Sequence, residues 1–364
     1  MFELLEKGVG ASALTRPQNI EYHRVFETAK ETGATHFLHG VAVTQHQGRL
    51  GVCFAFNDSL ENSITEQLLM RWSEDQGRSW SKVEPIAHPR NYANSHSVFL
   101  NHGEELWCFG PRFLGLGEGI VTKKGHRSLH FRNLQMEAWR YADGEWRAMG
   151  IVAEDFWPLG MPTRMDDGNW IIAGCDHAWL GALAISHGED FLHWDVVKPD
   201  TDGEVLTEAG AWVIGNRVLA VMRNETILTE VRYHAVVALS EDYGRSFGPC
   251  KVSNLPMATT KPFCGVLDDG RPYLVFNESV AGAPRDRGRL LLGVGKKGGF
   301  SLCKLYIVDE GSLLESQNRR LALSYPYARQ MGEKLYLGYS YESQPGNGGN
   351  NNDAMLAVVT AREL

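Results

Sequence analysis

The sequence predicts an all-β fold, a six-bladed β-propeller of four-stranded antiparallel blades, in a single domain over residues 1–364. Three observations predict it. A turn motif occurs twice, a longer strand–turn–strand pattern occurs six times, and residues suited to tight turns and short strands are abundant, with 39 Gly, 10 Trp, 12 Tyr and 15 Phe. Repeats of roughly 50 residues built from short strands are typical of propellers, in which each repeat forms one blade.

The turn motif reads SEDQGRSW at Ser73–Trp80 and SEDYGRSF at Ser240–Phe247. Each copy follows an apolar run that is typical of a buried strand. In such a turn the aspartate carboxylate accepts backbone N–H groups, the glycine adopts a positive φ, and the last aromatic residue packs back on the sheet. Two copies therefore indicate hairpins of the same construction in different blades.

The longer pattern is a short strand, a glycine turn and a strongly apolar strand. Its six copies predict blades that start near residues 36, 95, 159, 206, 259 and 323. Spacings of roughly 50 to 65 residues accommodate four strands and their turns. The last copy supplies one strand too few, so we expect the outermost strand of the sixth blade to come from residues 1–30 and close the ring. The only helix expected is a short one within residues 22–30.

The charge pattern argues against nucleic-acid and membrane partners. The net charge is −8 and no long basic run occurs, whereas nucleic-acid-binding surfaces are strongly basic. No stretch approaches the roughly 18 apolar residues of a membrane helix, and no signal-peptide pattern opens the chain. The six cysteines are scattered and are expected to be reduced, which fits a cytoplasmic protein. The missing signal-peptide pattern also predicts a cytoplasmic protein, with a secreted or periplasmic one as the alternative if a leader has been removed.

The starts of the six first strands are expected to meet at one mouth of the ring. Aligned on the glycine turn, the corresponding positions are His39, His96, the region 160–161, Glu208, Lys261 and Tyr325. Convergent titratable groups in a pocket indicate an active or binding site. Further candidates for substrate binding are Asp58, Arg112, Arg164, Arg223, Lys261 and Tyr327. His39 and His96 are catalytic candidates, which would bind substrate or transfer protons. No metal-ligand spacing and no cofactor motif is recognisable, so neither group is expected.

With these motifs the sequence resembles the sialidase superfamily of six-bladed propellers over nearly its full length. The turn motif resembles the Asp box of that family. The segment TEAGAWVIGNRVLAVMRNET resembles the one that carries a glutamate and then an arginine, and LSYPYARQMGEKLYLGYSYE resembles the last blade, which presents a tyrosine. The resemblance implies that Glu208 activates the nucleophile Tyr325, with Tyr327 as the second match, and that Arg223 binds a substrate carboxylate.

The implied chemistry is coherent. A neutral tyrosine is a poor nucleophile at pH 7, because its pKa is about 10, but an adjacent carboxylate can take its proton. Tyrosine replaces a carboxylate nucleophile where the carboxylate of the substrate would repel one. The planar guanidinium of arginine binds both oxygens of such a carboxylate.

The sequence also departs from the family. His39 stands where the arginine that opens the first blade is expected, the third arginine is matched only by the candidates Lys261 and Arg329, and the usual acid is matched at best by Asp58 or Glu61. The implied function is therefore a sialidase-like glycoside hydrolase that acts on an acidic sugar or carbohydrate chain and differs from a standard sialidase.

Two alternatives stay open. His39 and His96 also suit a polysaccharide lyase or a His-dependent rhamnosidase-like enzyme on uronate-containing glycans, because a lyase needs a base, an acid and a cation beside the uronate carboxylate. A non-catalytic glycan-binding propeller would need no proton-transfer pair. A hydrogen bond between Glu208 and Tyr325 favours the hydrolase, whereas a wide separation with converging histidines favours the histidine-based chemistry.

Overall fold

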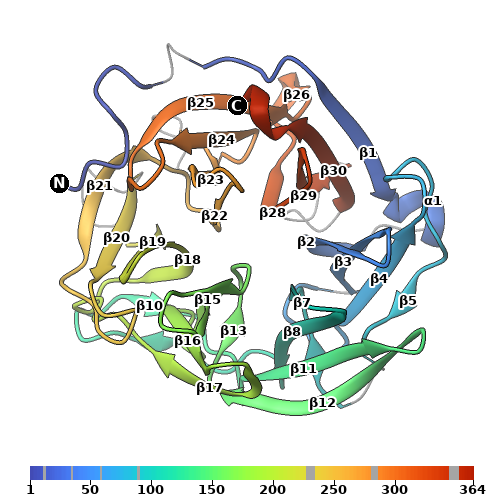
Figure 1. The fold of residues 1–364 in the computed structure, drawn as a ribbon, viewed down its shortest axis with the longest axis horizontal. Helices are drawn as coiled ribbons and strands as arrows, with labels where there is room; N and C mark the ends of the chain where they lie inside the picture. The colour runs from blue at the N-terminus through green and yellow to red at the C-terminus, as the bar shows by residue number, and fades with distance from the viewer. Residues whose placement is uncertain are drawn as a thin grey trace.

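Six antiparallel sheets are arranged around a central axis in the computed structural model, which Figure 1 shows along that axis. The structure describes residues 1–10, 14–33, 36–57, 60–87, 91–226, 234–279, 286–343 and 352–364. This arrangement confirms the predicted six-bladed, nearly all-β propeller. Within the described ranges, no helix is long and apolar enough to span a membrane.

The first three blades follow one another along the chain, and the strands of each are named in order from the axis outwards. Blade one contains β2 (Phe37–His46), β3 (Arg49–Asn57), β4 (Gln67–Ser73) and β5 (Glu84–Pro85). Blade two contains β6 (Ala93–Asn94), β7 (Val98–His102), β8 (Glu105–Phe113), β11 (Gln135–Ala142) and β12 (Glu145–Glu154). Blade three contains β13 (Trp157–Pro158), β14 (Thr163–Arg164), β15 (Trp170–Cys175), β16 (Gly181–His187) and β17 (Asp190–Val197).

The other three blades complete the ring. Blade four contains β18 (Leu206–Ile214), β19 (Arg217–Asn224), β20 (His234–Ser240) and β21 (Lys251–Pro256). Blade five contains β22 (Phe263–Val266), β23 (Pro272–Asn277), β24 (Arg289–Gly295) and β25 (Leu302–Glu310). Blade six contains β28 (Leu323–Met331), β29 (Lys334–Glu342), β30 (Asn352–Thr360) and β1 (Ile20–Phe26).

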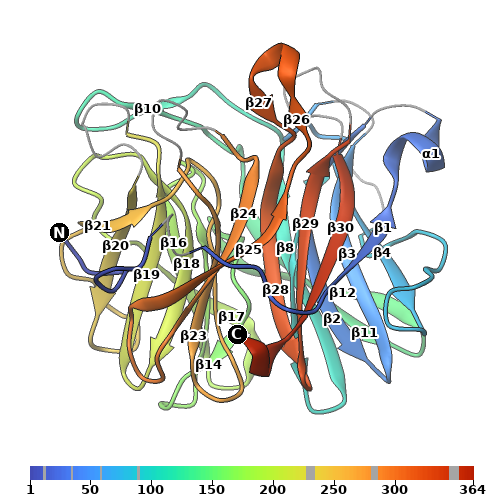
Figure 2. The ribbon, with the colours of Figure 1, turned by 90° about the horizontal axis from the view of Figure 1, so that it is seen from above.

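Several short secondary-structure elements lie at one end of the ring. Figure 2 shows there the hairpin of β26 (Leu313–Leu314) and β27 (Arg319–Arg320), strand β10 (Arg127–Ser128), which pairs with β9 (Ile120–Val121), and helix α1 (Thr28–Thr32). The described residues also contain two 3₁₀ turns, Glu315–Gln317 and Ala361–Glu363. The additions at this end surround the mouth at which the candidate site lies.

The N-terminal segment closes the ring. β1 pairs antiparallel with β30, with Ile20 opposite Val359, so it supplies the outermost strand of blade six. The helix expected within residues 22–30 is confined to α1, because residues 20–26 pair with β30 instead and this pairing overrides local helix propensity. The segment before β1 bridges to the outer strands of blades four and five, for example from Leu5 to Leu302.

The core fills the spaces between neighbouring blades with aliphatic and aromatic side chains, including the fully buried Trp212, Tyr273 and Phe109. Close packing of this kind is the main source of stability for a sheet ring. All six cysteines are free thiols, and Cys53, Cys108, Cys175 and Cys264 are buried.

The two turn motifs have nearly identical geometry. The Asp75 carboxylate accepts hydrogen bonds from the Ser79 amide at 2.8 Å and the Ser79 hydroxyl at 2.6 Å. The Asp242 carboxylate accepts the matching bonds from Ser246 at 2.9 and 2.6 Å. Hydrogen bonds from these serines are the main cause that lowers the pKa of both aspartates, for Asp75 to about 2.

Replacing Asp242 with alanine should lower the free energy of unfolding by about 1 kcal/mol, because the turn loses its acceptor at a partly exposed position. Since the pKa is lowered on folding, this contribution is present above the ordinary aspartate pKa of 3.8 and is lost as the pH falls below it. Urea unfolding at pH 7 and pH 3 measures both effects. Glu241→Ala, at the exposed neighbouring position, is the control; an equal loss there would contradict the prediction.

Candidate active site

All six innermost strands are interrupted at a similar level. In blades one, four and six the register shifts between His39 and Ala42, between Thr207 and Gly210, and between Ser324 and Tyr327. In blades two and three the interruption separates β6 from β7 and β13 from β14, and in blade five it lies between the bridge at Met257 and β22. Bulges of this kind bend a strand and redirect its side chains, often next to active sites.

The three bulges place equivalent residues in the left-handed region: Gly40 at φ 65°, Glu208 at 41° and Tyr325 at 52°. For residues other than glycine this conformation is strained and indicates a functional constraint. The blade-one equivalent of Glu208 and Tyr325 is therefore Gly40, not His39 as the sequence alignment had it. A Cβ on Gly40 would lie 2.2 Å from Cγ of His96, so the His96 ring occupies the space of the missing side chain.

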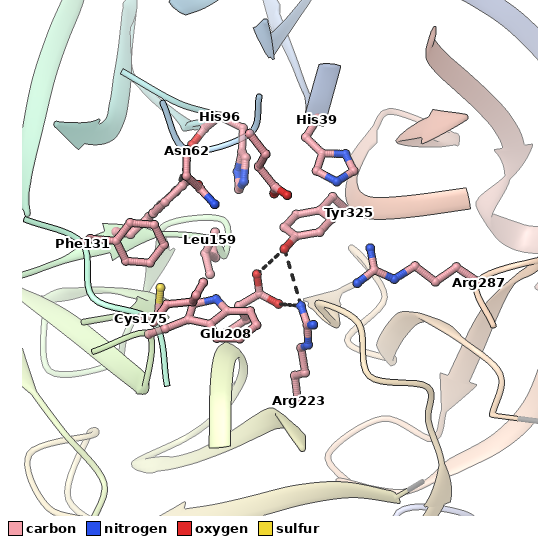
Figure 3. A pocket seen from close by; sticks show the side chains of 14 residues that line it. His39, Asn62, His96, Phe131, Leu159, Cys175, Glu208, Arg223, Arg287 and Tyr325 are labelled. Carbon is pink, nitrogen blue, oxygen red and sulfur yellow. Dashed lines mark hydrogen bonds and ion pairs between the residues drawn. The ribbon is translucent and has the colours of Figure 1, made fainter. Parts of the chain in front are cut away.

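The redirected side chains open into a cavity of about 140 Å³ at the mouth of the ring. Figure 3 shows the lining groups, with Arg223 and Arg287 on one side and Phe131 and Cys175 on the opposite side. The complete lining is His39, Glu61, Asn62, His96, Leu129, Phe131, Trp157, Leu159, Cys175, Trp179, Glu208, Arg223, Arg287 and Tyr325. The pocket thus combines a charged half with an apolar half.

Glu208 and Tyr325 meet at the centre of the pocket. The Tyr325 hydroxyl donates a hydrogen bond of 2.6 Å to Oε1 of Glu208, across 117 residues of chain. Burial and the Glu208 carboxylate raise the pKa of Tyr325 well above its usual value. Burial alone would also raise the pKa of Glu208, but Arg223 and the hydrogen bond from Tyr325 lower it below its usual value. The resting pair is therefore a neutral phenol hydrogen-bonded to an ionised carboxylate.

Arg223 orients the carboxylate of Glu208. Its Nη1 donates a bond of 2.7 Å to Oε2 of Glu208, and its Nε donates one of 2.6 Å to Glu225. The guanidinium also lies over the ring of Trp179, 4.6 Å from the centroid. Arg223 is therefore buried and largely committed to two carboxylates of the chain.

Arg287 is the residue that the sequence interpretation missed. It lines the pocket beside Arg223, and its guanidinium lies 5.7 Å from the ring centroid of Tyr325. Its bonds to the Ser324 hydroxyl and the Thr259 carbonyl are long, at 3.4 and 3.2 Å. Among the described residues no carboxylate forms an ion pair with Arg287, so it is the cation with N–H groups to offer an anionic ligand.

The candidates for a third arginine named from the sequence lie elsewhere. Arg329 follows Tyr327 along β28 and does not line the pocket. Lys261 is fully buried below the pocket, where its ammonium donates to the Pro326 carbonyl at 2.7 Å. Tyr327, the second match for the nucleophile, is also below the pocket and its hydroxyl lies 2.8 Å from Nδ1 of His96.

The two histidines line the pocket and are held neutral. His39 stacks on Tyr325 with ring centroids 4.3 Å apart, and its Nδ1 lies 3.1 Å from the Ser340 hydroxyl. Burial and the charge of Arg287 lower the pKa of His39 to about 3. Burial and the charge of Lys261 lower the pKa of His96 well below its usual value. Both rings therefore act as neutral walls beside Tyr325.

Glu61 stands at the mouth of the pocket. Its side chain is exposed to solvent at the rim, and desolvation on the pocket side together with the Glu208 carboxylate raises its pKa against the opposing charge of Arg287. Asp58, the other candidate for the acid, lies outside the described residues. A carboxyl group with a raised pKa beside one with a lowered pKa is the pattern of an acid and a base.

Two predicted substrate-binding residues are not brought to the pocket. Arg112 lies on β8 with its guanidinium 3.9 Å from the ring centroid of Tyr92. Arg164 lies on β14, after the interruption of its strand and at the end of the ring opposite α1 (Figure 2), where it is 61% exposed and faces Glu189. A linear pattern shows neither the interruption that precedes Arg164 nor the packing of Arg112 on Tyr92.

Outside the pocket, Asp155, Asp176 and His177 form a cluster with metal-ligand chemistry. The Lys198 ammonium lies 2.5 Å from Asp155 and 2.9 Å from Asp176. A cation of the chain thus already pairs with both carboxylates of this cluster.

Comparisons with known proteins agree with the geometry. The profile of the BNR repeat-like domain family matches residues 118–337, and no curated protein sequence is significantly similar to the chain. A Dyadobacter fermentans protein of unknown function is similar with a TM-score of 0.66 and 15% identity, over 94% of this chain and 99% of that one. An intramolecular trans-sialidase from Ruminococcus gnavus, in complex with oseltamivir carboxylate, is similar with a TM-score of 0.65 and 10% identity, over 94% and 98%.

A Trypanosoma rangeli sialidase in complex with sialic acid is also similar, with a TM-score of 0.64 and 12% identity, over 95% of this chain and 59% of that one. At these identities the likeness concerns the fold, a sialidase-like six-bladed propeller.

Proposed function

This chain belongs to the BNR repeat-like domain family, and we propose that its pocket is the active site of a glycoside hydrolase that acts on an acidic sugar or carbohydrate chain. The observation that carries the proposal is the 2.6 Å hydrogen bond from Tyr325 to Glu208 beside two arginines. Together these groups supply an activated nucleophile and a site for an anion.

In the proposed reaction the Tyr325 oxygen attacks the anomeric carbon while its proton passes to Glu208. Glu61 protonates the departing glycosidic oxygen, and the bond from that oxygen to the anomeric carbon breaks. Water then attacks the anomeric carbon of the glycosyl–tyrosine, giving its proton to Glu61, and the tyrosine oxygen leaves and recovers its proton from Glu208. The enzyme returns to its starting state, and the products are the free sugar and the leaving group.

The substrate carboxylate is assigned to Arg287, with Arg223 adding positive charge behind it. A charge-assisted pair of hydrogen bonds to a guanidinium fixes both oxygens of a carboxylate. The first blade contributes the neutral His39 and Gly40 instead of a cation. We therefore propose a substrate other than that of a standard sialidase, bound by fewer arginines.

The test is a panel of aryl glycosides of acidic sugars, each paired with its neutral carboxamide analogue. Release of the aryl group from acidic members only supports the proposal. A product that absorbs in the ultraviolet without uptake of water would instead support the lyase alternative. Saturable binding without turnover of any member would support a glycan-binding propeller. The histidine-based alternative has less support, since His39 and His96 are held neutral and Glu208 contacts Tyr325 directly.

The pH profile should depend on Glu61 and Glu208 in opposite ways. Glu208 must be ionised and its pKa is lowered, so the rise of kcat/KM should fall below the usual glutamate pKa of 4.5. Glu61 must be protonated and its pKa is raised, so the decline should lie above 4.5. Glu61→Gln should remove the decline and lower kcat about 100-fold for poor leaving groups. An unchanged decline in Glu61→Gln, with exposed Glu74→Gln as control, would reject Glu61 as the acid.

A further inference from the structure

Below the pocket, four blades meet at the Lys261 side chain. Lys261 occupies the interruption of the innermost strand of blade five, and its side chain is fully buried. Its ammonium donates to the Pro326 carbonyl of blade six at 2.7 Å and lies 3.5 Å from the Leu159 carbonyl of blade three. It also lies 3.9 Å from the ring centroid of Tyr327, whose hydroxyl contacts His96 of blade two.

Packing alone does not account for a lysine at this position. A buried ammonium is costly unless an anion compensates it, and Lys261 forms no ion pair with any residue of the described ranges. Two carbonyl contacts and the face of one tyrosine ring replace the usual carboxylate partner. A methionine would fill a similar volume without a buried charge, so the lysine contributes through its hydrogen bonds.

Those hydrogen bonds act one residue away from the nucleophile. Pro326 directly follows Tyr325, whose backbone is held in the left-handed region at φ 52°. Such a strained conformation persists only when its surroundings fix it. The ammonium of Lys261 fixes the Pro326 carbonyl, which is the next acceptor along the same bulge.

We propose that Lys261 is a positioning residue, which holds the bulge of blade six so that the Tyr325 hydroxyl stays in hydrogen-bond contact with Glu208. Lys261 does not line the pocket, so this role differs from the substrate contact expected from the sequence. The inference rests on the proposed function for its kinetic consequence only, since the geometry of Tyr325 can be measured without a substrate.

The first test is a crystal structure of Lys261→Met. We expect the hydrogen bond between Tyr325 and Glu208 to be lost in this variant, with the two oxygens beyond 3.5 Å. Lys261→Gln, which retains a neutral N–H donor, should preserve it. An unchanged bond in Lys261→Met would overturn the proposal, whether or not the protein hydrolyses any glycoside. If Lys261→Met does not fold, the structure of Lys261→Gln decides. A hydrogen bond from the glutamine amide to the Pro326 carbonyl, together with an intact bond between Tyr325 and Glu208, supports the role. An intact bond between Tyr325 and Glu208 without any donor to the Pro326 carbonyl overturns it.

The second test is kinetic. On an acidic aryl glycoside, Lys261→Met should lower kcat about 10- to 100-fold and leave KM within about twofold, because misplacing a reacting group affects the chemical step more than binding. Leu274→Ala, a buried change on β23 of the same blade, controls for loss of stability and should leave kcat unchanged. Equal losses of kcat in both variants would reduce Lys261 to a structural role. If the wild-type protein turns over nothing, the proposed function fails, while the crystallographic test still stands.

A third readout is the pH dependence of stability. Burial lowers the pKa of Lys261 to about 7, against the opposing charge of Glu208, and the other groups that face it are Cys264, His96 and Tyr327. Since the unfolded chain binds the proton up to its ordinary pKa of 10.5, the stability should rise from pH 7 towards pH 10. This rise should be absent from Lys261→Met, and a Lys261→Met variant that retains it would show that the rise does not come from the lowered pKa of Lys261.

Discussion

Tyr325→Phe should lower kcat on an acidic aryl glycoside by at least about 10³-fold, because it removes the hydroxyl that the proposed reaction uses as nucleophile. Glu208→Gln should have an effect of the same order, since the amide cannot accept the phenol proton. The double variant should be little worse than either single one, because the two groups act as a unit. Steady-state kinetics of the three variants measure this non-additivity directly.

Tyr339→Phe is the matched control for Tyr325→Phe. Tyr339 is also a buried tyrosine of blade six, and its hydroxyl also donates a bond of 2.6 Å to a carboxylate, that of Asp309. It does not line the pocket, so its removal should affect stability and leave kcat unchanged. Turnover that survives in Tyr325→Phe but not in Tyr339→Phe would reverse the assignment.

Arg287→Met should lower kcat/KM for acidic glycosides by about 10²- to 10³-fold, which corresponds to about 3–4 kcal/mol for a lost charge-assisted contact in a largely desolvated pocket. The same change should have little effect on carboxamide analogues, which carry no charge. The measurement is therefore the ratio of kcat/KM between the acid and its amide, in wild type and variant. A ratio that stays constant would assign the carboxylate to another group.

Arg289→Met provides the control for this second prediction. Arg289 lies two residues further along the chain and pairs with Glu278 and Glu310 at 2.8 Å. The same cation is therefore removed from the same blade, but outside the pocket. Its acid-to-amide ratio should equal that of the wild type.

The fold was predictable because its determinants are local. The motif at Asp75 and Asp242 describes hydrogen bonds within one turn, and alternating apolar residues describe strands one at a time. Because the same strand and turn pattern recurs six times, the local elements predict six similar blades and therefore a ring. Glu208, Arg223 and Tyr325 were predictable for a different reason, since each stands in a segment that resembles the same family.

The rest of the site depends on distances that a linear pattern does not contain. Arg287 stands in the connection before β24, not in a strand repeat, and reaches the pocket only because the ring brings blades four, five and six together. The sequence feature that could have identified Arg287 is the arginine-rich run before an apolar strand. His39 was aligned one residue out of place; the register of the paired strands, which a turn glycine does not reveal, makes Gly40 the equivalent of Glu208 and Tyr325.

The close contact between Gly40 and His96 also means that these two positions cannot be substituted independently. Each interrupted innermost strand presents one side chain to the mouth of the ring, whereas the outer strands and the closure by β1 maintain the ring. In blade one this position is Gly40, which has no side chain, and the imidazole of His96 from blade two occupies the space that a side chain would take. A side chain can therefore enter at position 40 only if the His96 side chain moves or is replaced by a smaller one, so substitution at position 40 in blade one depends on position 96 in blade two.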